Sequence, residues 1–217
     1  MLDRQGLITT TAYCIRLPTL KLRSLAADML GAICLISTQG HQQVLDGLSD
    51  AKQVLGETYR FEWLVSSLSA YEISLEGDES AIWEWRKSAM GLINAVAGSG
   101  DEVESRCEVR GELRRRGLDH AIEMLMAQEP TQTFLVQAEI YQQETREDLA
   151  ELSQLRIHYL TADALSAVQE EDEAETSSGE LGEQEVHDGH LAGLYDEISE
   201  LRNQVLTVLA PSPSCQV

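Results

Sequence analysis

The residues most able to bind a metal ion are five histidines, and only His187 and His190 lie close together in the sequence. Their spacing of three positions could place two imidazoles beside one metal ion. However, they lie in an acidic stretch without a third ligand held in place by a predicted element. Solvated loop histidines are the better interpretation, and we predict no metal site.

Nucleophilic and cofactor-dependent chemistry also lacks its usual motifs in this sequence. No GxSxG, HExxH, P-loop or GxGxxG pattern is present. The carboxylates fall on predicted exposed helix faces or in the acidic stretch, whereas general acid–base catalysis needs a pair in a shaped apolar pocket. We therefore expect no catalytic residue, no cofactor and no enzymatic activity. The four cysteines are far apart and form no CxxC pair, which is typical of buried reduced thiols in a cytoplasmic protein (Cys14, Cys34, Cys107 and Cys215).

The charge balance of the 217-residue chain restricts its partners. There are 37 acidic residues against 16 Lys and Arg, which gives a formal net charge of −21. Nucleic-acid binding through phosphate neutralisation is therefore not expected, and a basic partner is the more natural one. No apolar run approaches the ~18 residues of a membrane span, and Met1 to Thr11 lack the pattern of a signal peptide.

Composition divides the chain into four segments. Residues 1–19 are rich in threonine and show no periodicity, so we expect an irregular lead-in. Residues 20–167 form a helical body. Residues 168–189 form an acidic linker, because nine carboxylates and no Lys or Arg lie between Gln169 and Gly189, a composition typical of disorder.

The fourth segment, residues 190–210, carries apolar residues at alternating spacings of three and four (Leu191, Leu194, Ile198, Leu201, Val205 and Val208). This pattern predicts an amphipathic helix that resembles the start of a coiled coil. Two alternatives stay open at this stage. The helix folds back onto the body, or it pairs with a second copy to form a homodimer.

Apolar periodicity predicts an all-α body. Aromatic residues and β-branched runs are few, which argues against a β-sandwich or barrel. The helix from Ser24 to Ile36 has one broad apolar face (Leu25, Ala26, Met29, Leu30 and Ile33). A later helix begins at Ser80 as the N-cap and runs to Ala97. Further helices are expected to contain residues 44–48, 61–68, 102–116, 121–126 and 134–152.

A shift of 63 residues superimposes two of these helices. It places Arg23 on Arg86, and the apolar positions of the first helix on apolar positions of the second (Ala26, Met29, Leu30 and Ile33 on Ala89, Leu92, Ile93 and Val96). The same apolar face behind the same arginine indicates stacked helical repeats. Chance likeness between two amphipathic helices is the alternative.

The helix at 80–97 is apolar nearly all round, so it is either fully buried or buried on one side with a groove on the other. Leu92 repeats the core face of the first helix. That assignment leaves Met90, Ile93 and Ala97 as one stripe at helical spacing, with Asn94 beside it. We take this stripe as the candidate lining of a concave binding surface, with full burial as the alternative.

Several blocks of the chain match a known pattern in order and spacing. They are Ser24-Leu-Ala-Ala-Asp-Met-Leu-Gly-Ala-Ile-Cys-Leu-Ile36 with Gly40-His-Gln-Gln-Val-Leu45, Arg60-Phe61, Ser88-Ala-Met-Gly-Leu-Ile-Asn-Ala-Val96, and Glu104-Ser-Arg106 with Arg110-Gly-Glu-Leu-Arg-Arg-Arg-Gly-Leu118. Over residues 21–150 the chain resembles the formin homology 3 region of Diaphanous-related formins, particularly fungal ones.

The resemblance implies an armadillo-like domain, in which stacked helical repeats form a right-handed superhelix. In this family the domain is regulatory. Its concave surface binds an amphipathic helix with a basic tail, which is the autoregulatory segment near the formin's own C-terminus. A Rho-type small GTPase competes with that segment and so controls actin filament assembly. The expected location is the cytoplasm, at the actin cytoskeleton, and actin is reached only indirectly.

The resemblance also suggests residues for the groove. The family's groove includes the helix with the Leu-Ile-Asn-Ala motif, which stands here at Leu92 to Ala95. His41 begins a neighbouring helix that the family also uses. The predicted set that binds the autoinhibitory helix is therefore Met90, Ile93, Asn94, Ala97 and His41.

The chain departs from the family pattern in its extent. The GTPase-binding segment, the first repeats, and the formin homology 1 and 2 regions have no counterpart in these 217 residues. We interpret the chain as a partial domain, whether a fragment, a truncated product or a short paralogue. The alternative function is a free-standing armadillo-like scaffold with an unrelated protein partner.

Overall fold

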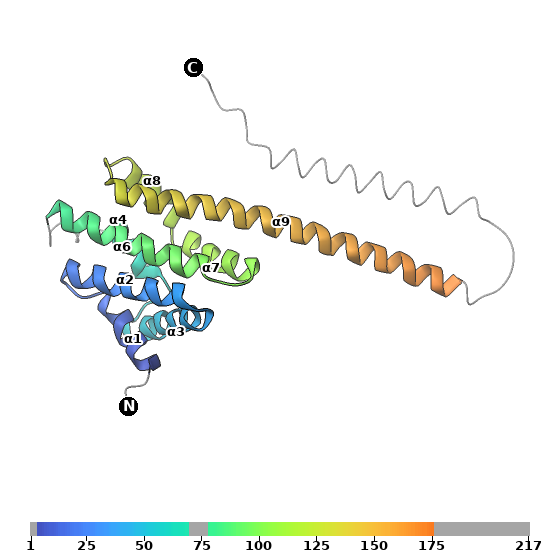
Figure 1. Ribbon diagram of the computed structural model, residues 1–217, viewed down its shortest axis with the longest axis horizontal. Coiled ribbons are helices and arrows are strands. Elements are labelled where there is room, and N and C mark those ends of the chain that lie inside the picture. Colours follow the sequence, from blue (N-terminus) through green and yellow to red (C-terminus); the bar gives the residue numbers. More distant parts are fainter. Residues whose placement is uncertain (1–3, 70–77, 176–217) are drawn as a thin grey trace, which may run out of the picture. The chain divides into compact units, whose positions relative to one another are not determined.

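The computed structural model describes residues 4–69 and 78–175, with side chains described up to residue 161. This part of the chain contains eight helices and no strand (Figure 1). The helices are α1 (Arg4–Cys14), α2 (Leu20–Ile36), α3 (Thr38–Leu55), α4 (Glu62–Ser69), α6 (Glu79–Gly98), α7 (Val103–Arg115), α8 (Leu118–Met126) and α9 (Gln132–Glu175). The predicted all-α class is confirmed. The described residues up to Leu160 form one compact unit, and the described residues from Thr161 on belong to a second unit.

Side chains and glycines set the ends of these helices. The Ser37 hydroxyl accepts a hydrogen bond from the Gly40 amide at 3.0 Å, which caps α3 directly after α2 has ended. The carboxylate of Asp78 accepts from the Ala81 amide at 2.7 Å and caps α6, so the cap lies two residues before the predicted Ser80. Gly117 has φ of +87°, a conformation that separates α7 from α8.

The predicted irregular lead-in is wrong for most of its length, because residues 4–14 form α1. Ile8, Ala12 and Ile15 lie at helical spacing and are buried, since α1 packs against α3 and α2. A Cβ atom on Gly47 of α3 would lie 3.2 Å from Cγ2 of Ile8, so the two helices come very close there. Three apolar residues are too few to predict a helix from the sequence. Their burial becomes clear only once α3 and α2 lie beside them.

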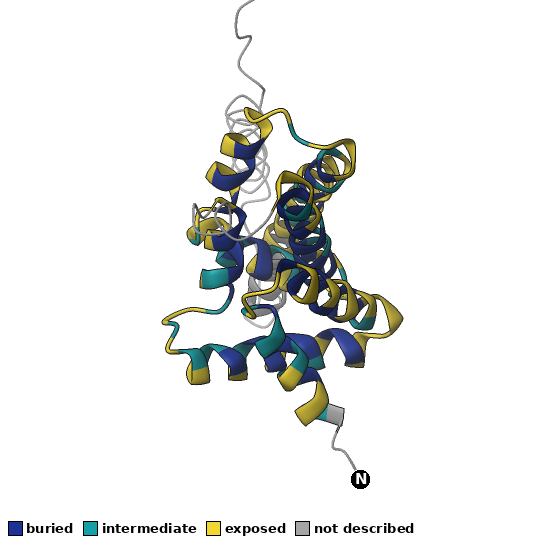
Figure 2. Cartoon of the chain, turned by 90° about the vertical axis from the view of Figure 1, so that its left-hand side faces the viewer, coloured by how far each residue is buried: buried dark blue, intermediate teal, exposed yellow. Residues whose placement is uncertain are grey.

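The centre of the core is the contact between α2 and α6 (Figures 1 and 2). The face of α2 that meets α6 includes Ala27 and Gly31, and a Cβ at Gly31 would lie 3.7 Å from Cα of Leu92. The predicted apolar face of α2 is only half right. Ala26 and Leu30 are buried, whereas Leu25 and Met29 are 56% and 49% exposed. Small residues allow the closer approach between helices, and they decide which side of α2 is inside.

The repeat of 63 residues has a structural counterpart at its two arginines. Arg23 and Arg86 are both buried, and each donates from Nε to a backbone carbonyl that precedes its helix, Leu17 for Arg23 and Leu68 for Arg86. Each guanidinium also lies over a tryptophan ring, 5.2 Å from the centroid for Arg23 and 4.5 Å for Arg86. Burial lowers the pKa of Arg86. The two helices thus share the same anchoring contact.

The long helix α9 is attached to the compact unit by its first half. The Phe134 ring packs edge-on against Trp83 at 5.4 Å, and Asp148 pairs with two arginines of α7. The helix continues to Glu175, so the predicted linker at 168–189 is helical over residues 168–175. Glu, Gln and Ala favour helices and their carboxylates stay hydrated on a helix surface, so acidity alone does not prevent the helix. The remainder of that linker and the predicted helix at 190–210 lie outside the described residues.

Candidate binding groove

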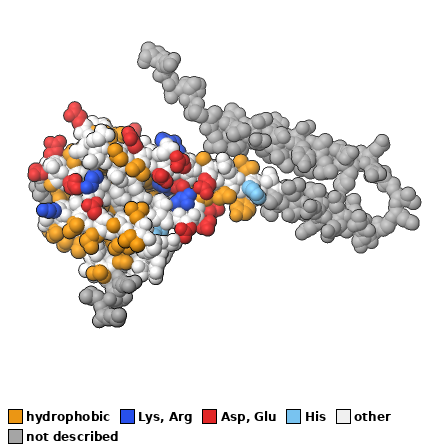
Figure 3. All heavy atoms as spheres, viewed as in Figure 1, with side chains coloured by type: hydrophobic (Ala, Val, Ile, Leu, Met, Phe, Trp, Pro, Cys, Tyr) orange, Lys and Arg blue, Asp and Glu red, His pale blue; other side chains and the backbone are white. Residues whose placement is uncertain are grey.

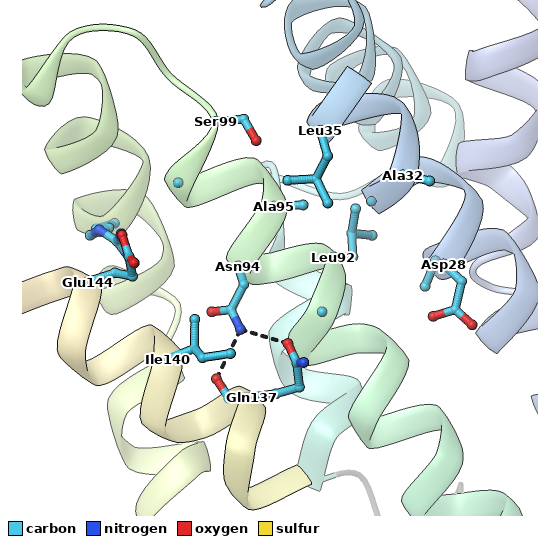
Figure 4. A pocket seen from close by; sticks show the side chains of 15 residues that line it. Asp28, Ala32, Leu35, Leu92, Asn94, Ala95, Ser99, Gln137, Ile140 and Glu144 are labelled. Carbon is cyan, nitrogen blue, oxygen red and sulfur yellow. Dashed lines mark hydrogen bonds between the residues drawn. The ribbon is translucent and has the colours of Figure 1, made fainter. Parts of the chain in front are cut away.

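An open groove of about 570 Å³ runs between α2, α6 and the first half of α9 (Figure 4). All three helices contribute to it, so residues far apart in the sequence meet along its length. Its lining comprises Ala27, Asp28, Gly31, Ala32 and Leu35 of α2, Gly91, Leu92, Asn94, Ala95 and Gly98 of α6 with the adjacent Ser99, Arg110 of α7, and Gln137, Ile140 and Glu144 of α9.

Small residues form the floor of this groove. Gly91 and Gly98 lie on the open side of α6, with Ala95 between them, and Gly31 lies opposite on α2. A Cβ on Gly98 would contact nothing within 4 Å, and one on Gly91 would lie 3.7 Å from Oε1 of Gln137. A partner helix can therefore bring its side chains close to the α6 backbone.

An amide pair connects α6 with α9 at the centre of the groove. Nδ2 of Asn94 donates to the backbone carbonyl and to Oε1 of Gln137, both at 2.9 Å, as the dashed lines in Figure 4 show. These bonds fix the position of α9 as one wall. Oδ1 of Asn94 is buried and has no hydrogen-bond partner. An unpaired buried carbonyl oxygen carries a desolvation cost that a donor from a ligand would remove.

The two rims of the groove combine apolar side chains with carboxylates. On α2 they are Leu35, which is 74% exposed, and Asp28. On α9 they are Ile140, which is 41% exposed, and Glu144. This arrangement is suited to an amphipathic helix whose apolar residues enter the groove and whose basic residues lie along its edges.

The predicted lining is displaced by one position on α6. Met90, Ile93 and Ala97 are completely buried, so they belong to the core and do not line the groove in this structure. That side of α6 is covered because the helix packs against α3, α4 and α7 as well as α2. Asn94, which was predicted to lie beside that stripe, is the one residue of the predicted binding set that lines the groove. The open face of α6 consists of Gly91, Asn94 and Gly98. Two glycines and an amide side chain at i, i+3 and i+7 form the sequence pattern from which this face could have been predicted.

His41 also lies away from the groove lining. Its ring is buried, and Nε2 donates to the backbone carbonyl of Val96 at 2.9 Å. Val96 lies in the last turn of α6, where carbonyls have no amide partner within the helix. His41 therefore joins α3 to the end of α6 and satisfies one of these carbonyls.

In the part of the chain that the structure describes, no group of three or more His, Cys, Asp and Glu side chains is placed to hold a metal ion. His187 and His190 lie outside the described residues. None of the described helices combines the length and the apolar character needed to cross a membrane.

The family model for the "Diaphanous FH3 Domain" matches residues 41–182, well over half of the chain and the whole of the α6 and α9 walls. The chain belongs to the Diaphanous FH3 family. This family is a formin regulatory domain without catalytic activity, and the prediction that the chain is not an enzyme is confirmed.

Individual formins are similar in sequence to this FH3 chain. It is 32% identical to Formin-F of Dictyostelium discoideum over 139 residues, which cover 63% of this chain and 11% of Formin-F. It is 30% identical to human Disheveled-associated activator of morphogenesis 2 over 125 residues, covering 56% of this chain and 11% of the relative. It is 23% identical to Inverted formin-2 of Xenopus laevis over 152 residues, which cover 70% of this chain and 13% of the relative.

The FH3 chain spans only about a tenth of the length of the curated relatives it matches, so it is similar to one region of each of them. The relatives come from Dictyostelium and vertebrates, so the expected likeness to fungal formins in particular is not supported.

Proposed function

We propose that this FH3 chain binds an amphipathic helix with a basic flank in the groove between α2, α6 and α9. The ligand is the C-terminal autoregulatory segment of a formin. By holding that segment, the chain takes part in the Rho GTPase control of actin assembly in the cytoplasm, and it acts on actin only through the formin. The observation that carries this proposal is the open groove with a floor of small residues and apolar rims.

The dimensions and lining of the groove support a helix as the ligand. Helix-in-groove recognition uses a few apolar side chains at i, i+3, i+4 and i+7. A volume of about 570 Å³ accommodates several such side chains, and the absence of side chains at Gly91 and Gly98 admits large ones. Leu35 and Ile140 would lose their exposed apolar surface when the ligand binds, which favours the complex.

The charges support a basic ligand. Asp28 and Glu144 lie on opposite rims, and the whole chain has a net charge of −21. This potential raises the rate of encounter with a basic peptide, and salt screens it.

The shared arginine anchor of α2 and α6 supports stacked armadillo-like repeats. The right-handed superhelix is taken from the resemblance to the family. We assign helices α1 to α8 and the part of α9 up to residue 167 to the FH3 domain, and residues 190–210 to a helix that can pair in a homodimer. The Rho-type GTPase enters this proposal as the competitor that releases the autoregulatory segment.

The experiment titrates the purified chain with a labelled peptide from the C-terminal region of a formin of the same organism. We expect micromolar or tighter binding that weakens as salt is raised. Ile140→Asp should abolish binding while keeping the melting temperature near that of the wild type, because this side chain is exposed until the ligand binds. Gly91→Leu should also block binding, because it fills the floor.

Ile93→Asp is the matched control for the face of α6. The side chain is fully buried, so the aspartate must be desolvated on folding, and we expect the chain to unfold. If the wild type does not bind the peptide, or if folded Ile140→Asp binds it normally, the proposal fails. In that case a scaffold with an unrelated partner becomes the better interpretation.

A further inference from the structure

Arg116, which directly follows α7, is stacked on the ring of Tyr59 in the connection between α3 and α4. The centre of its guanidinium lies 3.6 Å from the centroid of that ring. Tyr59 is 50% exposed, and Arg116 is half-buried. An arginine stacked on an aromatic face still presents its N–H groups in a planar fork at the edge of the guanidinium. These two residues, the Tyr59–Arg116 corner, therefore place hydrogen-bond donors and a positive charge beside an exposed aromatic ring.

The guanidinium of Arg116 forms no ion pair and no hydrogen bond with the part of the chain that the structure describes. Its Nε atom is buried without a partner. On the face shown in Figure 3, the few Lys and Arg side chains lie among Asp and Glu side chains. Arginines that pair with a carboxylate are Arg16, Arg60, Arg106, Arg110 and Arg114. Arg116 thus has N–H groups that solvent or a ligand must satisfy.

The carboxylates closest to this corner in the sequence are already bound to other groups. Glu112 lies one helical turn before Arg116, and both of its oxygens accept from Arg60, at 2.7 and 3.1 Å. Oε1 of Glu57 accepts from Nη1 of Arg16 at 3.1 Å. Neither carboxylate can pair with Arg116 without breaking these bonds, so a counter-charge for Arg116 has to come from another molecule.

The connection that carries Tyr59 is held in one conformation. Oε2 of Glu62 accepts from the backbone amides of Thr58 and Tyr59, at 3.0 and 3.1 Å. Phe61 is buried and has φ of +69°, which is strained for a bulky side chain. Strain of this kind persists only where the surrounding contacts over-determine the backbone. Tyr59 is therefore in position before a ligand arrives, which lowers the entropic cost of binding.

We propose that the Tyr59–Arg116 corner binds a phosphate group on a phosphorylated partner peptide. A phosphate monoester carries about 1.5 to 2 negative charges and three strong acceptor oxygens. Two of these oxygens match the fork of Arg116, and the third can accept a hydrogen bond from the Tyr59 hydroxyl. Arginine recognition of phosphorylated motifs is a common mode of peptide binding.

The overall charge of the chain favours a single phosphate over an extended anion. A net charge of −21 repels a long run of carboxylates and an anionic membrane surface. One phosphate instead concentrates its charge at one guanidinium. The corner is also separate from the groove, because neither Tyr59 nor Arg116 lines it. It therefore provides a second contact, which a partner makes only after it has been phosphorylated.

An NMR titration of the isotopically labelled full chain tests this proposal. The probe is a short neutral peptide of glycine and alanine that carries one phosphoserine. We expect shifts of the Tyr59 and Arg116 amides and a dissociation constant of about 0.1–1 mM, the range of a few charge-assisted hydrogen bonds at an exposed site. The same peptide with serine should not bind.

Variants of the two residues separate stacking from charge. Arg116→Lys should weaken binding about tenfold, because an ammonium lacks the planar fork and the stacked geometry. Tyr59→Phe keeps the ring under Arg116, so it should cost at most about threefold, whereas Tyr59→Leu should cost about tenfold. Each variant should melt within a few degrees of the wild type, since both side chains lie at the surface.

Arg115→Gln is the matched control for the loss of one positive charge. Arg115 is exposed, and its Nη1 lies over Gly111, where a Cβ would be 3.4 Å away. We expect Arg116→Gln to weaken phosphopeptide binding about tenfold and Arg115→Gln less than twofold. Equal losses for these two variants would show a general effect of charge and overturn the proposal.

Two other results would also overturn it. One is equal binding of the phosphorylated and unphosphorylated peptides. The other is Arg116-dependent binding to vesicles that contain a phosphoinositide, tighter than binding to the phosphopeptide, which would make a membrane the ligand. Binding of the formin peptide in the groove should survive Arg116→Gln, so failure of this proposal is distinguishable from failure of the proposed function.

Discussion

Arg110 of α7 donates from Nε to Oδ2 of Asp148 of α9 at 2.6 Å, and both side chains are almost completely buried. The other oxygen, Oδ1, accepts from Nε of Arg106 at 2.8 Å. Burial alone would lower the pKa of Arg106, but the hydrogen bond and charge of Asp148 outweigh it and raise that pKa above its usual value. One carboxylate thus holds α9 against α7 and keeps Gln137 and Ile140 in place as the wall of the groove.

Asp148→Ala should be among the most destabilising single changes in this chain. It leaves two arginines without their buried counter-charge, and breaking a buried pair in this way costs about 3–5 kcal/mol. Urea denaturation followed by circular dichroism measures the loss. Glu151→Ala is the control, because Glu151 pairs with the same Arg106 at 3.0 Å but is 56% exposed, so its removal should cost about 0–1 kcal/mol. Similar losses for the two variants would contradict the assigned role of Asp148.

His41→Ala should destabilise the end of α6. The variant leaves the carbonyl of Val96 buried without its donor, at a cost of about 1–3 kcal/mol. We expect faster amide exchange in the last turn of α6 as well as a lower midpoint in urea. His120→Ala serves as the reference because His120 is exposed on α8, and its stability should match the wild type. If the two histidine variants behaved alike, the bond to Val96 would have no structural importance.

The glycines of α6 and of the α7–α8 corner should respond in opposite ways to alanine. Gly117→Ala forces a side chain into the left-handed region at φ of +87° and should cost about 1–2 kcal/mol. Gly91→Ala places its Cβ at ordinary contact distance from Gln137 within a regular helix, so stability should rise by about 0.5–1 kcal/mol. Thermal melting of both variants checks the signs. A stabilised Gly117→Ala would show that the corner does not need its left-handed residue.

Stability should fall on the alkaline side because of Cys34. Burial raises the pKa of its thiol from 9.0 to about 12. A raised pKa in the folded state means that the stabilisation is complete below pH 9 and is lost as the pH rises from 9 toward 12. Urea midpoints at pH 8, 9.5 and 10.5 measure this loss. Cys34→Ala should be less stable at pH 8, because it leaves a small cavity, but its midpoint should fall less steeply above pH 9.

Tyr141 is another group to consider in that experiment, together with Cys107, because burial also raises the pKa of the Cys107 thiol. Burial raises the pKa of Tyr141 to about 12, so it loses stabilisation over pH 10 to 12 in the same direction. Tyr141→Phe therefore separates the contribution of Tyr141, since it should change the slope only above pH 10. If Cys34→Ala and the wild type had parallel pH profiles, the thiol would not be the source of the loss at pH 9–10.

Much of the helical architecture follows from local pattern. The helices that contain Val44 and Leu48, and Leu64 and Leu68, bury those residues as their spacing predicts. The family match was also predictable, because the Leu-Ile-Asn-Ala block and the Arg106–Arg110 spacing are local features of the sequence. These successes share one cause. A helix with one apolar stripe has only one way to place that stripe away from water.

The tertiary structure alone decided which side of α6 is open and whether α1 exists as part of the core. On α6, Met90, Ile93 and Ala97 have the same spacing as Gly91, Asn94 and Gly98, and a helix that is apolar nearly all round has no polar side to orient it. Its packing against α2, α3, α4 and α7 buries the first set, and its pairing with α9 leaves the second at the groove. For α1, Ile8 and Ala12 are too few to reveal a helix without α3 beside them. The periodicity of a sequence indicates how much apolar surface a helix must bury. Which neighbouring helix covers each side depends on contacts between residues that are far apart in the chain.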